Sequence, residues 1–304
     1  MSPVSSLSTV VATLRAAGCV FAEDEADLLV SAARTPEELT LMVERRAHGL
    51  PLEHVLGWAE FCGLRIDVDP GVFVPRRRTE FLVGQAVALA RRDARDEPVV
   101  VVDLCCGSGA MGAALATALA PPPPGRVEVH AVDIDPAAVR CARRNLAAVP
   151  GAAVPGAAVP GATVPGATVS GAAVSGHVHE GDLYGPLPAV LRGRVDLLVA
   201  SPPYVPTEAI RLLPTEARVH EPMVALDGGA DGLDVVRRVA RAAPLWLAPS
   251  GHLLVETSQR QARGTVEAVA RAGLDARVAD CEELGASVVI GTMPAAPVIA
   301  GPRV

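Results

Sequence analysis

Short apolar runs, bounded by glycine, proline or acidic residues, alternate with segments of helical periodicity along most of the chain. Continuous apolar runs of this length are typical of strands that are buried on both faces of a parallel sheet. Strands are predicted to begin at Val99, Val127, His177 and Val195. A helix is predicted before them at 79–92, and others are predicted between them, one after Gly109 and one at 137–147. This alternation predicts an α/β protein with a doubly wound, mostly parallel sheet.

The N-terminal part of the chain has helical periodicity instead. Thr35 followed by Pro36 supplies a cap and a first-turn proline, which is a common start of a helix. The predicted helices lie at 8–17, 23–33 and 36–48. We therefore expect a small helical domain over residues 1–70, a β-rich connector at 64–74 that extends to about residue 78, and a second domain over 79–304.

A pentapeptide that begins with Pro150-Gly151-Ala152-Ala153-Val154 recurs through residues 150–176. Proline and glycine every five residues prevent a helix, and alanine and valine side chains are too small to form a core alone. We expect a flexible or extended surface loop, inserted between a helix and a strand without disturbing the sheet.

Two motifs of the second domain indicate a nucleoside site. The strand that begins at Val99 leads into a turn of small residues, where Gly107 and Gly109 let a ligand approach the backbone and a helix start presents free amides. The next strand ends at Asp133, whose carboxylate could accept both hydroxyls of a ribose. Together the motifs form one nucleoside-binding half of a doubly wound sheet.

Two classes of cofactor fit this half, a dinucleotide and S-adenosylmethionine. The turn Cys105-Cys106-Gly107-Ser108-Gly109 does not reproduce the glycine spacing that clears a pyrophosphate in the dinucleotide fingerprint. A nucleoside without phosphates fits better, so S-adenosylmethionine is the expected cofactor and the sheet is expected to be a Rossmann-like methyltransferase sheet.

The segment Ser201-Pro202-Pro203-Tyr204 follows the strand that begins at Val195. Two prolines cannot continue a sheet ladder, and they leave carbonyl oxygens with no following amide to compete for them. Ser201 adds a hydroxyl and Tyr204 a ring face, so a planar –NH2 group could be held in its plane and stacked from above. The segment therefore predicts a site for methylating an amide or an exocyclic amine.

With these motifs the chain resembles the protein-(glutamine-N5) methyltransferases that modify peptide release factors, over nearly its whole length. Segments that a generic methyltransferase does not need carry the resemblance. They are 45–52, 57–64, 71–80, Glu221-Pro222 and 225–233.

The resemblance implies a role for each motif residue. Gly107, Ser108 and Gly109 would lie against the methionine part of S-adenosylmethionine, with Cys105 and Cys106 in the same turn. Asp133 would hold the ribose, and Asp182 and Leu183 would border the adenine. Ser201, Pro202, Pro203 and Tyr204 would hold the glutamine amide, with Ser201 also bordering the cofactor. The implied partner is a protein with a target glutamine, a release factor or a ribosomal protein, and the helical domain would help to recognise it.

The chain departs from the family pattern at several positions. The family usually has glycine at position 105, an aromatic residue near Leu183 and asparagine at position 201. Its usual Arg-Pro-Glu-Thr-Glu is Arg76-Arg77-Arg78-Thr79-Glu80 here. The change at Ser201 matters most, because asparagine offers a donor and an acceptor in fixed geometry and serine offers one rotatable hydroxyl.

Composition narrows the alternatives. There is no lysine among the 27 basic residues, which excludes a Schiff-base lysine and a Walker-type phosphate loop. The net charge of −7 argues against a general nucleic-acid-binding surface, and we expect the arginine run 76–78 to be a solvated loop. The six cysteines have no zinc or disulfide spacing, and His177 and His179 have no apparent third ligand, so no metal is expected.

No leader or membrane-spanning segment is predicted, so we expect a cytoplasmic monomer. Two other classes of function remain open on the sequence alone. One is methylation of an exocyclic amine of adenine or guanine in nucleic acid, which uses a similar Pro-Pro-Tyr turn. The other is a binding protein that keeps the cofactor fold without catalysis.

Overall fold

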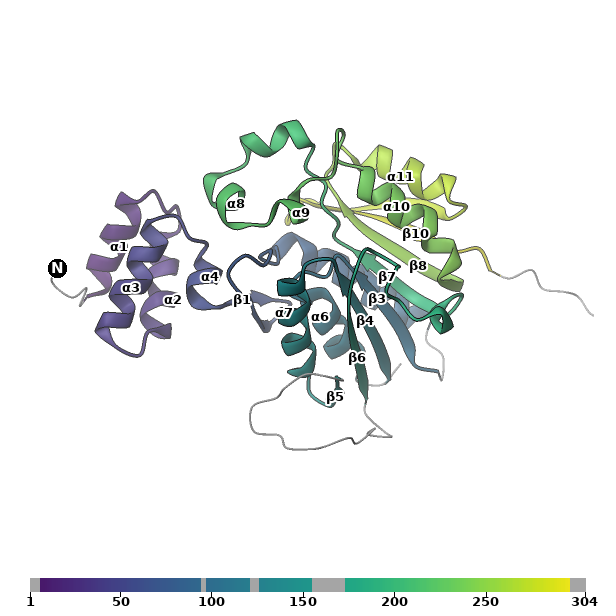
Figure 1. Ribbon diagram of the computed structural model, residues 1–304, viewed down its shortest axis with the longest axis horizontal. Helices are drawn as coiled ribbons and strands as arrows, with labels where there is room; N and C mark the ends of the chain where they lie inside the picture. The colour runs from purple at the N-terminus through teal and green to yellow at the C-terminus, as the bar shows by residue number, and fades with distance from the viewer. Residues whose placement is uncertain (1–5, 94–96, 121–125, 155–172, 296–304) are drawn as a thin grey trace, which may run out of the picture.

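A computed structural model of the chain describes residues 6–93, 97–120, 126–154 and 173–295, and in it one eight-stranded sheet organises most of the molecule (Figure 1). The strand order is β5-β6-β4-β3-β7-β8-β10-β9. The strands are β3 (Val99–Leu104), β4 (Val127–Asp133), β5 (Ala152–Ala153), β6 (Val174–Glu180), β7 (Val195–Ala200), β8 (Leu247–Thr257), β9 (Asp275–Cys281) and β10 (Ala286–Thr292).

The sheet is parallel from β5 to β8, and β10 pairs antiparallel with both β8 and β9. The chain passes from β3 outward to β4 and β6, and then returns to β7 on the other side of β3. This reversal is the topological switch point of a doubly wound sheet, where ligands bind at the carboxyl ends of the strands. The predicted fold class is therefore confirmed, and the switch point lies between the two strands that precede the glycine and proline motifs.

Helices cover both faces of the sheet, which explains why β3 is buried at every position. One face packs against α5 (Glu80–Arg92), α6 (Ala110–Leu119) and α7 (Pro136–Ala147), and the other against α10 (Asp234–Ala242) and α11 (Ala262–Arg271). The remaining segments are α8 (Thr215–His220), α9 (Met223–Leu226) and the 3-10 turns Arg77–Thr79, Ala189–Leu191, Thr207–Leu212 and Ala243–Leu245. No helix in the described ranges has the length and apolarity needed to cross a bilayer.

The N-terminal helices form a separate bundle beside the sheet (Figure 1). They are α1 (Leu7–Ala16), α2 (Ala22–Ala32), α3 (Pro36–Ala47) and the short α4 (Leu52–Leu56). Thr35 caps α3 and Pro36 occupies its first turn, as the sequence predicts. The connector differs from its prediction, because the hairpin of β1 (Trp58–Phe61) and β2 (Leu64–Asp67) begins before residue 64 and ends before residue 74.

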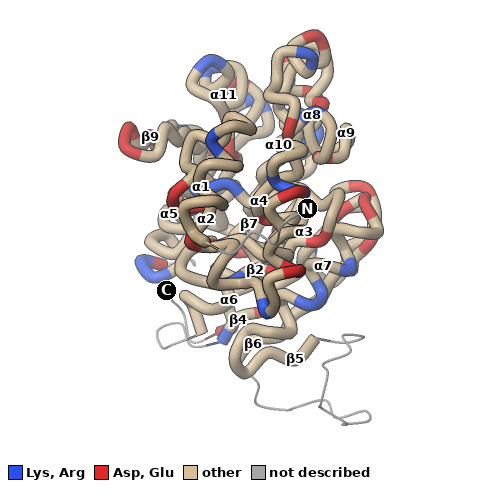
Figure 2. The backbone as a smooth tube through the Cα atoms, turned by 90° about the vertical axis from the view of Figure 1, so that its left-hand side faces the viewer, with Lys and Arg blue, Asp and Glu red and all other residues tan. Residues whose placement is uncertain are grey.

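One arginine links the helical bundle to the second domain. The Arg46 side chain on α3 pairs with Glu25 of α2 at 2.6 Å and with Glu216 of α8 at 3.1 Å, and only 11% of the arginine side chain is exposed. Figure 2 shows acidic and basic positions interspersed over the side of the molecule that carries the helical bundle. The ion pair holds α8 toward the bundle.

The repeat segment differs in part from the predicted loop. Its first copy contributes β5, which pairs with β6, and β6 itself begins at Val174 instead of His177. A Cβ atom added to Gly176 would lie 2.8 Å from the Val154 side chain, so the glycine allows the two ends of the segment to pack closely. Residues 155–172 lie outside the described residues.

We expect that replacing residues 155–172 by a short Gly/Ser turn leaves the melting temperature nearly unchanged. Loop length alters closure entropy by only about 0.6 kcal/mol per doubling, and the change keeps β5 and the whole of β6. Thermal unfolding followed by circular dichroism measures the effect. A matched deletion that also removes Ala152 and Ala153 should be less stable, and equal stability of the two deletions would contradict the role given to β5.

Candidate active site

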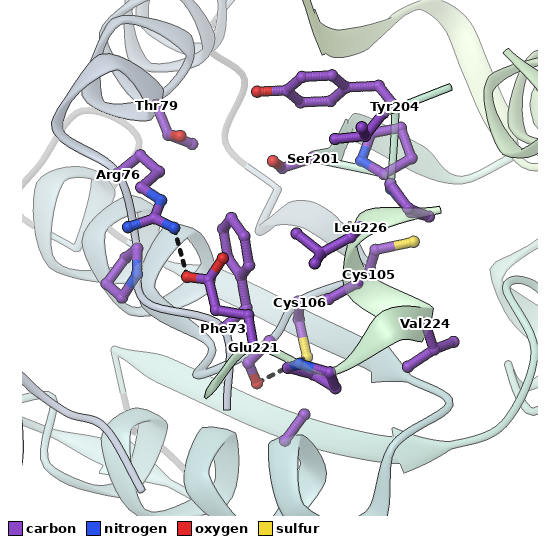
Figure 3. Close-up of a pocket in the computed structure, with 18 of the residues that line it drawn as sticks. Phe73, Arg76, Thr79, Cys105, Cys106, Ser201, Tyr204, Glu221, Val224 and Leu226 are labelled. Carbon is purple, nitrogen blue, oxygen red and sulfur yellow. Dashed lines mark hydrogen bonds and ion pairs between the residues drawn. The ribbon is translucent and has the colours of Figure 1, made fainter. Parts of the chain in front are cut away.

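A cavity of about 930 Å³ opens at the carboxyl ends of the parallel strands, next to the switch point. Segments that are distant in the sequence line it, including the ends of β3, β4 and β7 and the segment around α8 and α9. Figure 3 shows Ser201, Thr79 and the hydroxyl of Tyr204 along one side, with Cys105 and Cys106 on another. The cavity therefore brings together the two motifs that the sequence places almost a hundred residues apart.

The turn after β3 approaches the cavity through left-handed backbone. Cys105 has a φ of 56° and Gly107 a φ of 54°. A non-glycine residue in such a conformation costs about 1–3 kcal/mol, so Cys105 carries strain where the family pattern has glycine. Gly109 does not line the cavity; its Cβ position lies 2.8 Å from Cβ of Ala142, so the glycine allows α6 to pack closely on α7.

Asp133 closes β4 and holds this turn in place. Its Oδ2 accepts a hydrogen bond from the Gly107 amide at 2.8 Å, and its Oδ1 accepts one from the Asp135 amide at 2.9 Å. Burial raises the pKa of the carboxyl above its usual range. Each carboxylate oxygen has a second lone pair that could accept a ribose hydroxyl at the cavity wall.

Asp103 supports the turn from inside the sheet and was not singled out from the sequence. The residue is fully buried, and its Oδ2 accepts a hydrogen bond from the Gly112 amide at 2.9 Å. Burial raises the pKa of its carboxyl to about 7. Asp103 does not line the cavity, so it fixes the start of α6 without contacting a ligand there.

Asp182 and Leu183, which the resemblance assigns to the adenine, follow β6 and line the same cavity as Asp133. Leu183 has a φ of 48°, and the residue is 9% exposed. Asp182 forms an ion pair with Arg238 of α10. An apolar side chain and a charged pair thus border this part of the cavity.

The segment Ser201–Tyr204 leaves β7 at the opposite side of the cavity. A glycine-rich loop packs closely against its backbone. A Cβ atom added to Gly228 would lie 2.8 Å from the Pro203 carbonyl oxygen, and one added to Gly232 would lie 2.3 Å from the Tyr204 carbonyl oxygen. Gln261 donates a hydrogen bond to the Tyr204 carbonyl at 2.8 Å. Among the described residues, no N–H or O–H group donates a hydrogen bond to the Pro202 carbonyl oxygen, so this oxygen could accept one from a substrate.

Sequence reasoning missed a buried carboxylate behind Ser201. Glu256 of β8 is 3% exposed, and its Oε2 accepts hydrogen bonds from Thr79 Oγ1 at 2.5 Å and from Ser201 Oγ at 3.2 Å. The signal that could have found it is the one used for Asp133, an apolar strand run that ends in an acidic residue.

The expectation that the arginine run is a solvated loop is wrong for two of its members. Arg76 pairs with Glu221, and Arg78 donates from Nε to Glu256 at 3.0 Å and from Nη2 to the Tyr204 hydroxyl. Burial raises the pKa of Glu221, which is 6% exposed. Two buried carboxylates from distant segments thus draw Arg76 and Arg78 into the cavity wall, as Figure 3 shows for Arg76.

The histidines of β6 have neighbours that the sequence did not indicate. His130 of β4 stacks on His177, and its Nδ1 shares a hydrogen bond of 3.0 Å with Nε2 of His179. Its other ring nitrogen, Nε2, lies 2.9 Å from Oε1 of Glu128. Ligand atoms of Glu128, His130 and His177 lie within 4.8 Å of one another. Both nitrogens of His130 already have partners, so a metal ion would have to displace them.

Comparisons with known proteins agree with this geometry. A family model described as the methyltransferase small domain matches residues 64–156. The release factor glutamine methyltransferase of Geobacter sulfurreducens is 37% identical over 241 residues, which are 78% of this chain and 72% of that protein. The 4-amino-L-phenylalanine/4-methylamino-L-phenylalanine methyltransferase of Streptomyces pristinaespiralis is 35% identical over 252 residues, which are 82% of this chain and 74% of that protein.

One solved structure supports the fold independently. The hMettl16 catalytic domain, determined in complex with the MAT2A 3′UTR hairpin 6, has a TM-score of 0.51 at 13% sequence identity. The similarity covers 83% of this chain and 81% of that one. At this identity the likeness concerns the methyltransferase fold alone.

Proposed function

Because the chain belongs to the family of release factor glutamine methyltransferases, we propose that it transfers a methyl group from S-adenosylmethionine to the side-chain amide nitrogen of a glutamine in a peptide chain release factor. The observation that carries the proposal is the shared cavity of the turns after β3 and β7. Release factors act in the cytoplasm, so the proposal includes a cytoplasmic location.

The residues around the glycine turn fit a nucleoside cofactor. The Asp133 carboxylate has lone pairs for the ribose, and the cavity volume of about 930 Å³ leaves room for an acceptor beside the cofactor. Asp182 and Leu183 would border the adenine, and the backbone at Gly107 and Ser108 would face the methionine part. When bound, S-adenosylmethionine supplies a methyl group that its positively charged sulfur already activates.

The protein's own task is then to orient the acceptor nitrogen. An amide nitrogen is a weak nucleophile because its lone pair is delocalised, so alignment is the main contribution, worth about 7–11 kcal/mol at best. The N–H groups would donate to the Pro202 carbonyl and to Ser201 Oγ, while the Tyr204 ring would cover the amide plane. These contacts fix the nitrogen without removing its proton in advance.

We also assign substrate recognition to the helical bundle. Pro51, the N-cap residue of α4 in the bundle, and Glu216, which pairs with Arg46, both line the cavity. A protein that inserts its glutamine would therefore meet the bundle and α8 together. This placement supports recognition of a folded partner over a free amino acid.

A second candidate acceptor is the amino group of a small aromatic amine. Ser201 in place of the family's asparagine favours it, because a hydroxyl is a smaller and less selective partner for a nitrogen than a side-chain amide. The relative from Streptomyces pristinaespiralis is named for methylation of 4-amino-L-phenylalanine, at an identity close to that of the release factor enzymes.

Incubation with methyl-labelled S-adenosylmethionine tests both candidates. We expect mass spectrometry to find one methyl group on a glutamine of a release factor. Methylation of 4-amino-L-phenylalanine with an unmodified release factor would replace the first proposal by the second, and methylation of neither would contradict both.

We expect Ser201→Ala to lower the rate of methyl transfer by about ten- to a hundredfold, since one alignment contact of about 1–3 kcal/mol is lost. Ser201→Asn should retain or raise the rate on a glutamine substrate, because it restores the family's amide. Single-turnover assays at saturating cofactor measure both. If asparagine abolishes transfer to glutamine, the pocket has been reshaped for another acceptor.

A further inference from the structure

The carboxylate of Glu256 lies directly behind the acceptor turn. Glu256 is near the end of β8, which pairs with β7, and the backbone positions of Val255 and Ala200 face each other one residue before the two side chains. The side chain of Glu256 is 4% exposed. A buried carboxylate is stable only when donors surround it, so the donors around it reveal what it holds in place.

Three donors converge on Glu256. Arg78 Nε donates to Oε1 at 3.0 Å, while Thr79 Oγ1 and Ser201 Oγ both donate to Oε2, at 2.5 Å and 3.2 Å. Arg78 also donates to the hydroxyl of Tyr204. The carboxylate thus connects the residue that would contact the acceptor nitrogen with the residue whose ring would cover it.

We propose that Glu256 is a positioning residue that makes the Ser201 hydroxyl a hydrogen-bond acceptor for the substrate nitrogen. This role rests on the proposed function. A free serine hydroxyl rotates and can donate or accept. Once its hydrogen is committed to Glu256, its two lone pairs are all that it presents to the cavity.

The consequence is a preference for nitrogens that carry hydrogen. A hydroxyl that only accepts favours an amide –NH2 or a primary or secondary amine, and leaves a tertiary nitrogen without a partner. The same arrangement explains how serine can stand where the family has asparagine. An asparagine at 201 could donate its –NH2 to Glu256 and present its carbonyl to the substrate, so in both cases the carboxylate directs an acceptor oxygen into the cavity.

A double-mutant cycle tests this role. Glu256→Met removes the acceptor while keeping the side-chain length, and it is measured with serine and with alanine at position 201 by single-turnover transfer at saturating cofactor and acceptor. We expect a loss of about ten- to a hundredfold with Ser201 present and a clearly smaller loss with Ser201→Ala, because the contact with the serine is already absent there and only the support of Arg78 and Thr79 is removed. Cofactor affinity, measured by calorimetry, should stay within about twofold.

A second variant, Glu256→Asp, is tested in case Glu256→Met does not fold. Glu256→Asp keeps the charge for Arg78 but withdraws the carboxylate by one methylene from Ser201, and it is expected to show the same dependence on the residue at 201. The control is Glu25→Gln, which alters another buried glutamate that pairs with an arginine but lies in the helical bundle. Its effect should simply add to that of Ser201→Ala.

The outcomes separate the role from the function. Equal losses from a Glu256 variant in the serine and alanine backgrounds overturn the positioning role, as does an unchanged rate for Ser201→Ala. A parent chain that methylates neither a release factor nor 4-amino-L-phenylalanine overturns the proposed function, and the role of Glu256 with it. If the unmodified chain methylates either acceptor, the double-mutant cycle of Glu256 and Ser201 decides whether Glu256 has the positioning role.

Discussion

Replacing Asp133 by alanine is expected to weaken S-adenosylmethionine binding about 10- to 150-fold. Hydrogen bonds to a charged group contribute about 1.5–3 kcal/mol, and each 1.4 kcal/mol changes the affinity tenfold. The structure adds a second cause, because the same carboxylate holds the Gly107 amide at 2.8 Å. The variant would therefore lose both the ribose acceptor and the support of the turn that faces the ligand.

Asp133→Asn should not restore affinity. Both carboxylate oxygens already accept from backbone amides, of Gly107 and of Asp135, so an asparagine must direct its –NH2 group at one of these two donors. Isothermal titration calorimetry measures the affinities. Glu180→Ala is the matched control, because Glu180 faces Asp133 on the neighbouring strand but does not line the cavity. Unchanged affinity in both Asp133 variants would move the cofactor site elsewhere.

Gly232→Ala is expected to reduce methyl transfer by about a hundredfold while cofactor affinity changes little. A Cβ at this position would lie 2.3 Å from the Tyr204 carbonyl oxygen and 2.2 Å from Nε2 of Gln261. The Gln261 side chain can move, but the Tyr204 backbone can yield only by shifting the acceptor turn. A displacement of about 1 Å in substrate positioning can cost about a hundredfold in rate.

Gly273→Ala separates this effect from backbone strain. Gly273 has a φ of 87°, close to the 77° of Gly232, yet no heavy atom lies within 4 Å of its Cβ position. Both variants should lose about 1–2 kcal/mol of stability from the left-handed backbone. Single-turnover transfer and thermal unfolding of the two variants provide the comparison. Equal transfer rates would show that the glycine loop does not set the position of Tyr204.

The elements that carry the cofactor motifs were predictable because their signals are local. The apolar run of β3 continues into a turn rich in small residues, and the run of β4 ends at Asp133, so strand ends and ligand-facing residues are adjacent in the sequence. The Thr35 cap of α3 is local in the same way. The connector was less predictable, because β1 and β2 are four residues each and their pairing, more than their composition, makes them strands.

The surroundings of the acceptor turn were not predictable for the opposite reason. The contact of Ser201 with Glu256 spans 55 residues, and those of Glu256 with Arg78 and Thr79 span 178 and 177. No local pattern indicates that these side chains meet, and the arginine run was accordingly expected in a solvated loop. The stacked histidines of β4 and β6 show the same limit, since His130 meets His177 only through strand pairing.

The sequence by itself therefore determined the strands and helices that carry the motifs, the order of those motifs and the chemistry that each offers, because periodicity, caps and turn residues act over a few positions. The tertiary structure alone decided which side chains meet. It placed the ends of β3 and β7 side by side at the switch point and set Glu256 behind Ser201. It also packed Gly232 against the Tyr204 backbone. Such contacts depend on how the sheet brings distant segments together.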